Sequence, residues 1–238
     1  FYYLLIPFFL ITKMDPIGTI YFAIIIGLST IFSLYFVLSK LFKTEVGLIA
    51  AFLYAALLTP INADRWVVPT ITTNLWVVWY FFTVIKIARG DYRVLPLLGI
   101  LIGLIWHIHI ALIPTLIAIP AAFIFAKKLP NVKQIVQFFI FLFITNIPLL
   151  MFEVRHGFGQ TLSLISNFST PLAGATGLYK FTLVLDMIAK NTNTLLFSPQ
   201  SFQLFNGISL IAIILLSGLW LVKKRLLLRK ELIVLISW

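Results

Sequence analysis

Three polar side chains able to do chemistry, Glu153, Arg155 and His156, follow directly on an apolar stretch that ends at Phe152. An arginine holds phosphate oxygens through two parallel hydrogen bonds, and a histidine adds a donor or relays a proton. The group therefore predicts a binding site for a phosphate group. The alternative is a surface anchor, in which Arg155 and His156 extend to the polar surface and Glu153 pairs with one of them.

Arg65 stands between Asp64 and Trp66 in a short polar connection between two apolar runs. A short turn would hold the guanidinium rigidly, so we consider a second phosphate-facing position here. The alternative is a surface ion pair between Arg65 and Asp64, with Trp66 as an interfacial anchor.

His107 and His109 lie two residues apart at the end of another apolar run. On one α-helix this spacing separates the side chains by about 200° around the axis. They cannot share a metal ion unless the helix ends between them. Ionisable residues at membrane depth are costly and often functional, so we expect one of the two to line a site, with a plain interfacial histidine as the alternative.

No metal or cofactor is expected. The chain has no cysteine, so it has no thiolate ligand or nucleophile. It also lacks the Walker and Rossmann glycine patterns, HExxH and GxSxG.

The composition excludes a water-soluble globule. Of the 238 residues, 61% are hydrophobic and 11% are charged, and the mean hydropathy is +1.08. Soluble domains are about one quarter charged, whereas values like these are typical of chains with several membrane spans. They predict an all-α polytopic membrane protein. Residues 1–238 form a single transmembrane domain in this interpretation, because no low-complexity linker divides the chain.

A bilayer core of about 30 Å requires about 20 apolar residues of helix. Residues 153–206 would form a long extracytoplasmic loop, with short interfacial helices at 160–168 and 178–190. The apolar start at Phe1 and the brief run after Glu231 indicate a fragment that is truncated at both ends. We expect complete spans at residues 16–41, 46–62, 66–88, 91–109, 110–126, 133–152 and 207–222, and the start of an eighth at Glu231.

The apolar stretch 94–126 would fit either one very long helix or two short helices joined at residues 106–110. Charge favours the hairpin, because it puts Arg93, Lys127 and Lys128 on one side. The loops at 40–43, 86–93, 127–133 and 223–230 then share that side and hold most of the 18 Lys and Arg residues. Positive loops mark the cytoplasmic face, so the candidate site residues fall on the outer face of a cell membrane. The net charge of +11 then requires no nucleic-acid partner.

Four stretches of the chain resemble the polytopic GT-C glycosyltransferases, in particular the protein O-mannosyltransferase and aminoarabinose transferase-like group (glycosyltransferase family 39). Residues 1–9 resemble the segment that enters the second span, and residues 46–55 with Arg65, Trp66 and Pro69 resemble the third span and the turn after it. Residues 98–103, with a following histidine, resemble the fifth span. Residues 148–158 resemble the entry into the large outer loop.

The resemblance implies a GT-C-like bundle that transfers a sugar from a polyprenyl-phosphate donor to a protein, lipid or glycan acceptor, inverting the anomeric centre. It also implies an acidic catalytic residue in a loop before Phe1, so the catalytic residue is unknown here. The guanidinium groups and one histidine would hold the leaving phosphate around a single outer cavity, while the other polar groups orient the substrate. The substrate-binding candidates are Arg65, His107, His109, Glu153, Arg155 and His156.

Two other classes of protein remain open. A multi-span transporter or lipid flippase would also have many spans and few charges, but no duplicated pair of broken helices is visible in the sequence. A noncatalytic membrane scaffold is the third interpretation, which scattered outer-face Arg and His residues would favour.

Overall fold

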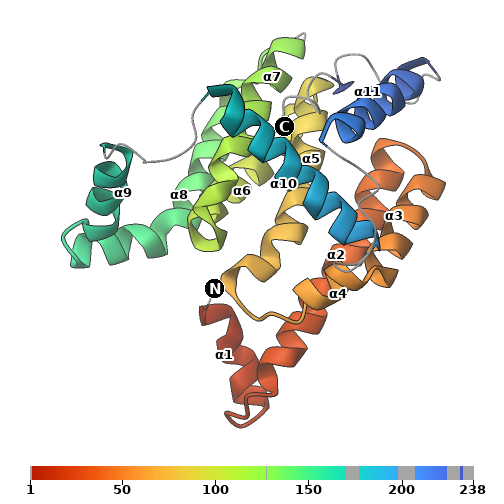
Figure 1. Ribbon diagram of the computed structural model, residues 1–238. Helices are drawn as coiled ribbons and strands as arrows, with labels where there is room; N and C mark the ends of the chain where they lie inside the picture. The colour runs from red at the N-terminus through yellow and green to blue at the C-terminus, as the bar shows by residue number, and fades with distance from the viewer. Residues whose placement is uncertain (1, 127, 170–176, 198–206, 224–230, 233–238) are drawn as a thin grey trace.

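The computed structural model describes residues 2–126, 128–169, 177–197, 207–223 and 231–232 (Figure 1). Within these ranges all regular secondary structure is helical, which confirms the predicted all-α class. The α-helices are α1 (Tyr2–Ile11), α2 (Gly18–Leu41), α3 (Thr44–Ala56), α4 (Leu58–Ala63), α5 (Thr73–Ala88), α6 (Leu95–Ile108), α7 (Ala118–Phe125), α8 (Val132–Arg155), α9 (Gly159–Ser169), α10 (Gly177–Phe197) and α11 (Gly207–Lys223). Three short 3-10 helices join them: η1 (Pro69–Thr72), η2 (Tyr92–Val94) and η3 (Ile110–Ile117).

Three helical segments are long and apolar enough to cross a membrane: Gly18–Leu41, Pro69–Ala88 and Val132–Arg155. The larger number of complete spans expected from the sequence stays a prediction, because the other apolar helices among the described residues are shorter. Of the expected eighth span, only Glu231 and Leu232 fall within the described residues.

The predicted span at 46–62 is divided into α3 and α4. The chain leaves the helical conformation at Leu57, where φ is −75° and ψ is 135°. Pro60 explains the break, because it has no N–H to bond the Ala56 carbonyl and its ring would clash with that oxygen. The run expected to form one span is therefore two helices, and the span itself stays a prediction.

The predicted hairpin within residues 94–126 is confirmed. His109 is extended, with φ −166° and ψ 130°, and it ends α6. After η3 and α7 the chain returns to the start of α6, where the Tyr92 and Phe123 rings stack with centroids 5.7 Å apart. The Tyr92 hydroxyl also donates a hydrogen bond to the Lys128 carbonyl. These contacts place the basic residues at the two ends of the hairpin together.

The main core lies where α5, α6 and α7 pack together. Trp76 and Tyr80 of α5 stack with ring centroids 4.7 Å apart, and the Trp76 indole donates to the Leu101 carbonyl at 2.7 Å. The buried indole N–H is thereby satisfied, as a tryptophan in an apolar interior requires.

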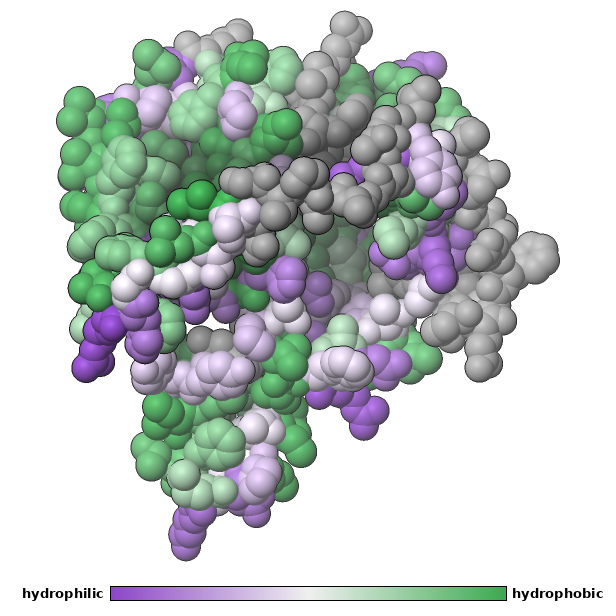
Figure 2. Space-filling model, turned by 60° about the vertical axis from the view of Figure 1, so that its left-hand side comes forward, coloured by the Kyte–Doolittle hydropathy of each residue, from purple (hydrophilic) through white to green (hydrophobic). Residues whose placement is uncertain are grey.

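Helix α8 packs along α6 through two glycines. A Cβ atom at Gly99 would lie 2.3 Å from the Phe138 carbonyl oxygen, and one at Gly103 would lie 1.9 Å from the Thr145 hydroxyl oxygen. Glycines four residues apart share one helix face and allow close backbone approach, which is a common packing mode in membranes. A neighbouring side of α8 exposes Phe139 and Phe143 at 58% and 61% of their surface. Hydrophobic side chains also cover much of the surface in Figure 2, as expected for contact with lipid.

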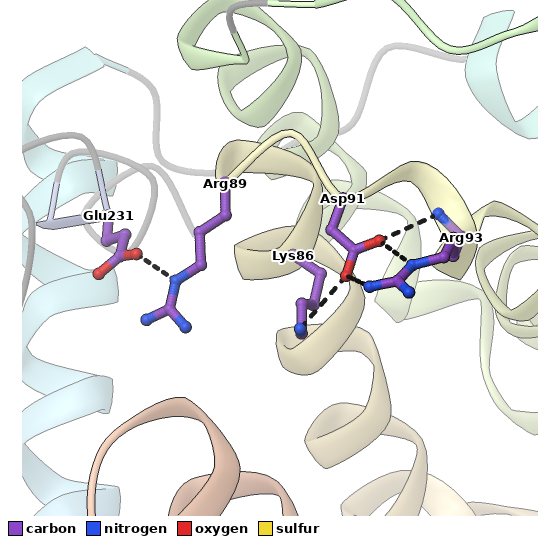
Figure 3. Close-up of polar contacts among 5 residues, drawn as sticks. All are labelled: Lys86, Arg89, Asp91, Arg93 and Glu231. Carbon is purple, nitrogen blue, oxygen red and sulfur yellow. Dashed lines mark hydrogen bonds and ion pairs between the residues drawn. The ribbon is translucent and has the colours of Figure 1, made fainter.

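Ion pairs gather at the connection between α5 and α6 (Figure 3). Arg89 donates to Glu231 at 2.5 Å and to the Leu41 carbonyl at 3.1 Å, so it joins the end of α2 to residue 231. Asp91 accepts from Arg93 at 2.8 Å and from Lys86 at 3.3 Å. The hydrogen bonds from Arg93, followed by those from Lys86, hold the pKa of Asp91 well below its usual range.

Replacement of Gly99 by alanine should destabilise the protein, because the added methyl group would meet a backbone oxygen of α8 and force the two helices apart. We expect a cost of about 1–3 kcal/mol, typical of overpacking, seen as a lower Tm of the purified protein in detergent. Gly159→Ala is the matched control, since no described atom lies within 4 Å of the place that its methyl group would take. Equal Tm values for the two variants would contradict the close contact.

Candidate functional site

The candidate site residues lie at the end of the bundle opposite the ion pairs of Figure 3. In Figure 1 the connection after α4, the end of α6 and the end of α8 all lie toward the lower side, whereas the connection between α5 and α6 lies at the upper side. The end of α8 projects away from the bundle and is separated from the α4 connection. The arrangement puts Arg65 and Arg155 at the same end but on distant elements.

Arg65 is exposed, and the alternative of an ion pair with Asp64 is not formed in the part of the chain that the structure describes. Asp64 instead accepts hydrogen bonds from the Tyr54 hydroxyl at 3.0 and 3.2 Å. The Asn74 side-chain amide donates to the Tyr54 oxygen at 2.9 Å. Burial raises the pKa of the Asp64 carboxyl. We call these three residues, Tyr54, Asp64 and Asn74, the Tyr54 cluster.

The Tyr54 cluster fastens α3, the α4 connection and α5 to one another, and it also reaches α2. A Cβ atom at Gly27 of α2 would lie 3.1 Å from an Asp64 carboxylate oxygen, so glycine makes room for the carboxylate. Sequence analysis missed this cluster. The available signal was an acidic residue in a short connection between apolar helices, but no local spacing links Asp64 to Tyr54 or Asn74.

The two histidines have separate structural partners. The His107 Nε2 atom lies 3.0 Å from the Thr145 carbonyl oxygen, and since a carbonyl only accepts, Nε2 carries the proton. His109 Nδ1 accepts from the Ala111 backbone N–H at 3.1 Å and so caps η3. Among the described residues, no group of three or more His, Cys, Asp or Glu side chains could hold a metal ion.

Glu153 is 3% exposed, and its Oε2 atom accepts from the Thr161 backbone N–H at 3.0 Å. It therefore caps the start of α9. The predicted pairing of Glu153 with Arg155 or His156 does not occur as an ion pair within the described ranges. His156 stacks on the Phe152 ring at 4.0 Å and its Nδ1 lies 2.8 Å from the Phe152 carbonyl, while Arg155 is exposed.

Two cavities lie along the α6–α8 pair. The first, the apolar cavity, has a volume of about 640 Å³ and is lined mainly by Trp, Leu and Ile side chains of α5 and α6 together with residues of α1 and α8. His107 and Thr145 lie in its wall. The second, the Glu153 cavity, has a volume of about 650 Å³. Its lining residues are Trp106, Ile110, Leu149, Glu153, Gly159, Gln160, Thr161 and Ser163.

From the sequence we expected one cavity surrounded by Arg65, a terminal histidine and Arg155. The structure does not have this arrangement. Neither arginine lines the apolar cavity or the Glu153 cavity. The physical reason is the course of α8, which contacts α6 and α9 and carries Arg155 beyond the other helices (Figure 1). The structure instead brings His107 to Thr145 and places Trp106 and Glu153 in the wall of one cavity.

Comparison with protein-family models, with curated proteins and with solved structures finds no match for this chain. The resemblance to glycosyltransferases therefore stays a prediction.

Tyr54→Phe should lower stability, because the change leaves the partly buried Asp64 carboxylate without the hydroxyl donor and the Asn74 amide without its acceptor. The expected cost is about 1–3 kcal/mol, measured as a fall in Tm. Tyr21→Phe is the control, because Tyr21 is 49% exposed on α2. A Tyr54→Phe protein as stable as the Tyr21→Phe protein would show that the cluster holds nothing together.

Proposed function

We propose that this chain belongs to a multi-pass membrane glycosyltransferase that moves a sugar from a polyprenyl-phosphate donor to a protein, lipid or glycan acceptor at the outer face of a cell membrane. The observation that carries the proposal is the apolar cavity. It offers a volume of about 640 Å³ beside helices that are apolar enough to lie in a bilayer.

The lining of the apolar cavity suits an isoprenoid chain. Trp79, Leu97 and Leu104 provide apolar surface against which such a chain can pack by van der Waals contact, as helices do in a bilayer. His107 and Thr145 provide the polar part of the wall. A lipid with a long apolar chain and one charged linkage would place its chain along the apolar part of the wall and its linkage near the polar part.

The leaving phosphate needs positive charge at the outer end of the bundle. Arg65 and Arg155 are exposed on separate elements and line neither cavity. Arg155 ends α8, which forms part of the wall of the apolar cavity, so its guanidinium is the better candidate to hold phosphate oxygens through two parallel hydrogen bonds. Direct attack by an acceptor hydroxyl on the anomeric carbon would release the prenyl phosphate and invert that carbon. A carboxylate base would take the proton of the hydroxyl, and Asp64 is not assigned this role because it already accepts hydrogen bonds from Tyr54.

The multi-pass arrangement is supported by the three long apolar segments and by four shorter apolar helical stretches, Tyr2–Ile11, Thr44–Ala56, Tyr92–Ile108 and Ile110–Phe125. The basic connection that contains Arg93 would face the cytoplasm, and the ends that contain Arg65 and Arg155 would face outward.

Cysteine labelling tests this sidedness directly, because the native chain contains no cysteine. Arg65→Cys and Arg155→Cys proteins in intact cells should react with a membrane-impermeant maleimide, whereas Arg93→Cys should react only after the cells are opened. Reaction of positions 65 and 155 from opposite sides would remove the proposed outer site.

Donor binding tests the apolar cavity. A photoreactive short-chain polyprenyl phosphate should label α6 and α8 in the chain reconstituted in nanodiscs. Leu104→Trp fills the cavity and should weaken labelling about tenfold, equivalent to about 1.4 kcal/mol, while Phe143→Trp on the exposed face of α8 should not. Equal labelling of the two variants would contradict donor binding in this cavity.

Turnover separates the enzyme from a lipid flippase, for which the same apolar cavity would serve. Arg155→Ala should abolish sugar transfer to acceptor and leave membrane insertion intact. Movement of the labelled lipid between leaflets without sugar transfer would favour the flippase.

A further inference from the structure

Glu153 holds a buried carboxylate oxygen that has no hydrogen-bond partner among the described residues. Its Oε2 atom is bonded by Thr161, but Oε1 accepts no hydrogen bond from any residue that the structure describes, although the side chain is only 3% exposed. Buried polar atoms in native proteins are nearly always paired, because leaving one unpaired costs free energy. Glu153 Oε1 and Ser39 Oγ are the exceptions among the described side chains, and Glu153 lies in the wall of the Glu153 cavity.

The backbone between α8 and α9 is shaped to build this site. Gly157 and Phe158 both adopt left-handed conformations, with φ of 64° and 60°. A non-glycine residue such as Phe158 occupies this region only at a cost in free energy. The reversal lets the His156 and Phe158 N–H groups bond the Glu153 carbonyl at 3.2 and 2.9 Å, and it returns Thr161 to the Glu153 carboxylate.

The rest of the wall combines an aromatic face with groups that donate and accept hydrogen bonds. Trp106 is 46% exposed and presents its indole at the end of α6. Gln160, Thr161 and Ser163 contribute an amide and two hydroxyls. A cavity of about 650 Å³ lies in the size range of small-molecule sites. An aromatic face, a carboxylate and an amide together suit the C–H faces and hydroxyl groups of a sugar.

The charges around the cavity favour a neutral ligand over an ammonium ion. The start of α9 carries the positive end of a helix dipole, and its N–H groups face the Glu153 carboxylate, which accepts from the Thr161 N–H. These groups already offset the carboxylate and would repel a cation. An anion would in turn be repelled by Glu153 itself.

We propose that the Glu153 cavity binds a neutral, hydroxyl-bearing ligand of sugar size, with Glu153 Oε1 accepting a hydrogen bond from a ligand hydroxyl and Trp106 covering one face. The identification of this ligand as the acceptor of sugar transfer rests on the proposed function, but the binding itself does not. The cavity is close to the apolar cavity, since Pro148 lines one and Leu149 the other.

The test uses a diazirine-bearing glucose as the probe, with the full chain in nanodiscs and labelled peptides mapped by mass spectrometry. Label is expected on the segment 156–163 and on Trp106. Glu153→Gln should weaken binding about tenfold, since it removes a charged acceptor while its amide oxygen still caps α9. Glu45→Gln is the matched control, because Glu45 is an exposed carboxylate on the first turn of α3.

Gln160→Ala is a second variant, which tests whether the Glu153→Gln effect is only structural. Gln160 lines the cavity, and its replacement leaves the hydrogen bond from Thr161 to Glu153 in place. Weaker labelling in both variants, with unchanged helix content by circular dichroism, supports the site. Labelling that maps elsewhere, or that is insensitive to both changes, overturns it. Preferential, Glu153-dependent labelling by a diazirine-bearing alkylammonium would overturn the neutral ligand class.

The prenyl-phosphate probe distinguishes this inference from the proposed function. Glucose labelling of the Glu153 cavity without prenyl-phosphate labelling of the apolar cavity would retain the site and remove the glycosyltransferase. Prenyl-phosphate labelling of the apolar cavity with an unlabelled Glu153 cavity would retain the proposed glycosyltransferase and remove the sugar site.

Discussion

The close approach of α6 and α8 is the constraint on which both cavities depend. In a bilayer the surrounding lipid is as apolar as leucine, so helix association relies on close packing and hydrogen bonds rather than on the hydrophobic effect. Gly99 and Gly103 allow the backbones to meet, and the His107 ring donates to an α8 carbonyl one turn further along the same face. This helix pair sets the positions of Trp106 and Glu153 relative to each other.

The polar residues of the chain divide into those that hold helices together and those that remain open to a ligand. His107, His109 and the Tyr54 cluster make bonds to neighbouring segments. Arg65 and Arg155 are exposed. Glu153 does both, because one carboxylate oxygen caps α9 and the other has no partner within the described ranges.

Much of the helical layout could be predicted from the sequence, because apolar run length and loop charge are local properties. The turn at His109 followed from the charges of Arg93 and Lys128, and it is present. The break at Leu57 was missed, since Pro60 lies in a run whose composition is otherwise continuous. The Tyr54 cluster and the cap from Glu153 to α9 were missed as well, because each depends on which helices pack together.

Sequence reasoning expected the arginines to converge, since it assigned residues to one end of the bundle without knowing the direction in which each helix leaves it. Helix α8 continues past α6 as far as Arg155 and turns into α9 there. Sidedness can be predicted from charge, whereas lateral position depends on side-chain packing that no local pattern encodes.

The division of one apolar run into α3 and α4 has a mechanical consequence for a surrounding bilayer. With 13 residues, α3 rises only about 20 Å, against a hydrocarbon thickness of about 30 Å. Lipids beside so short a helix would compress or tilt to cover it, at a modest cost per ångström of mismatch. If α3 crosses the bilayer without α4, the membrane along this flank would be thinner and its headgroup layer would lie further inward, which would shorten the path by which a lipid headgroup leaves the bulk membrane.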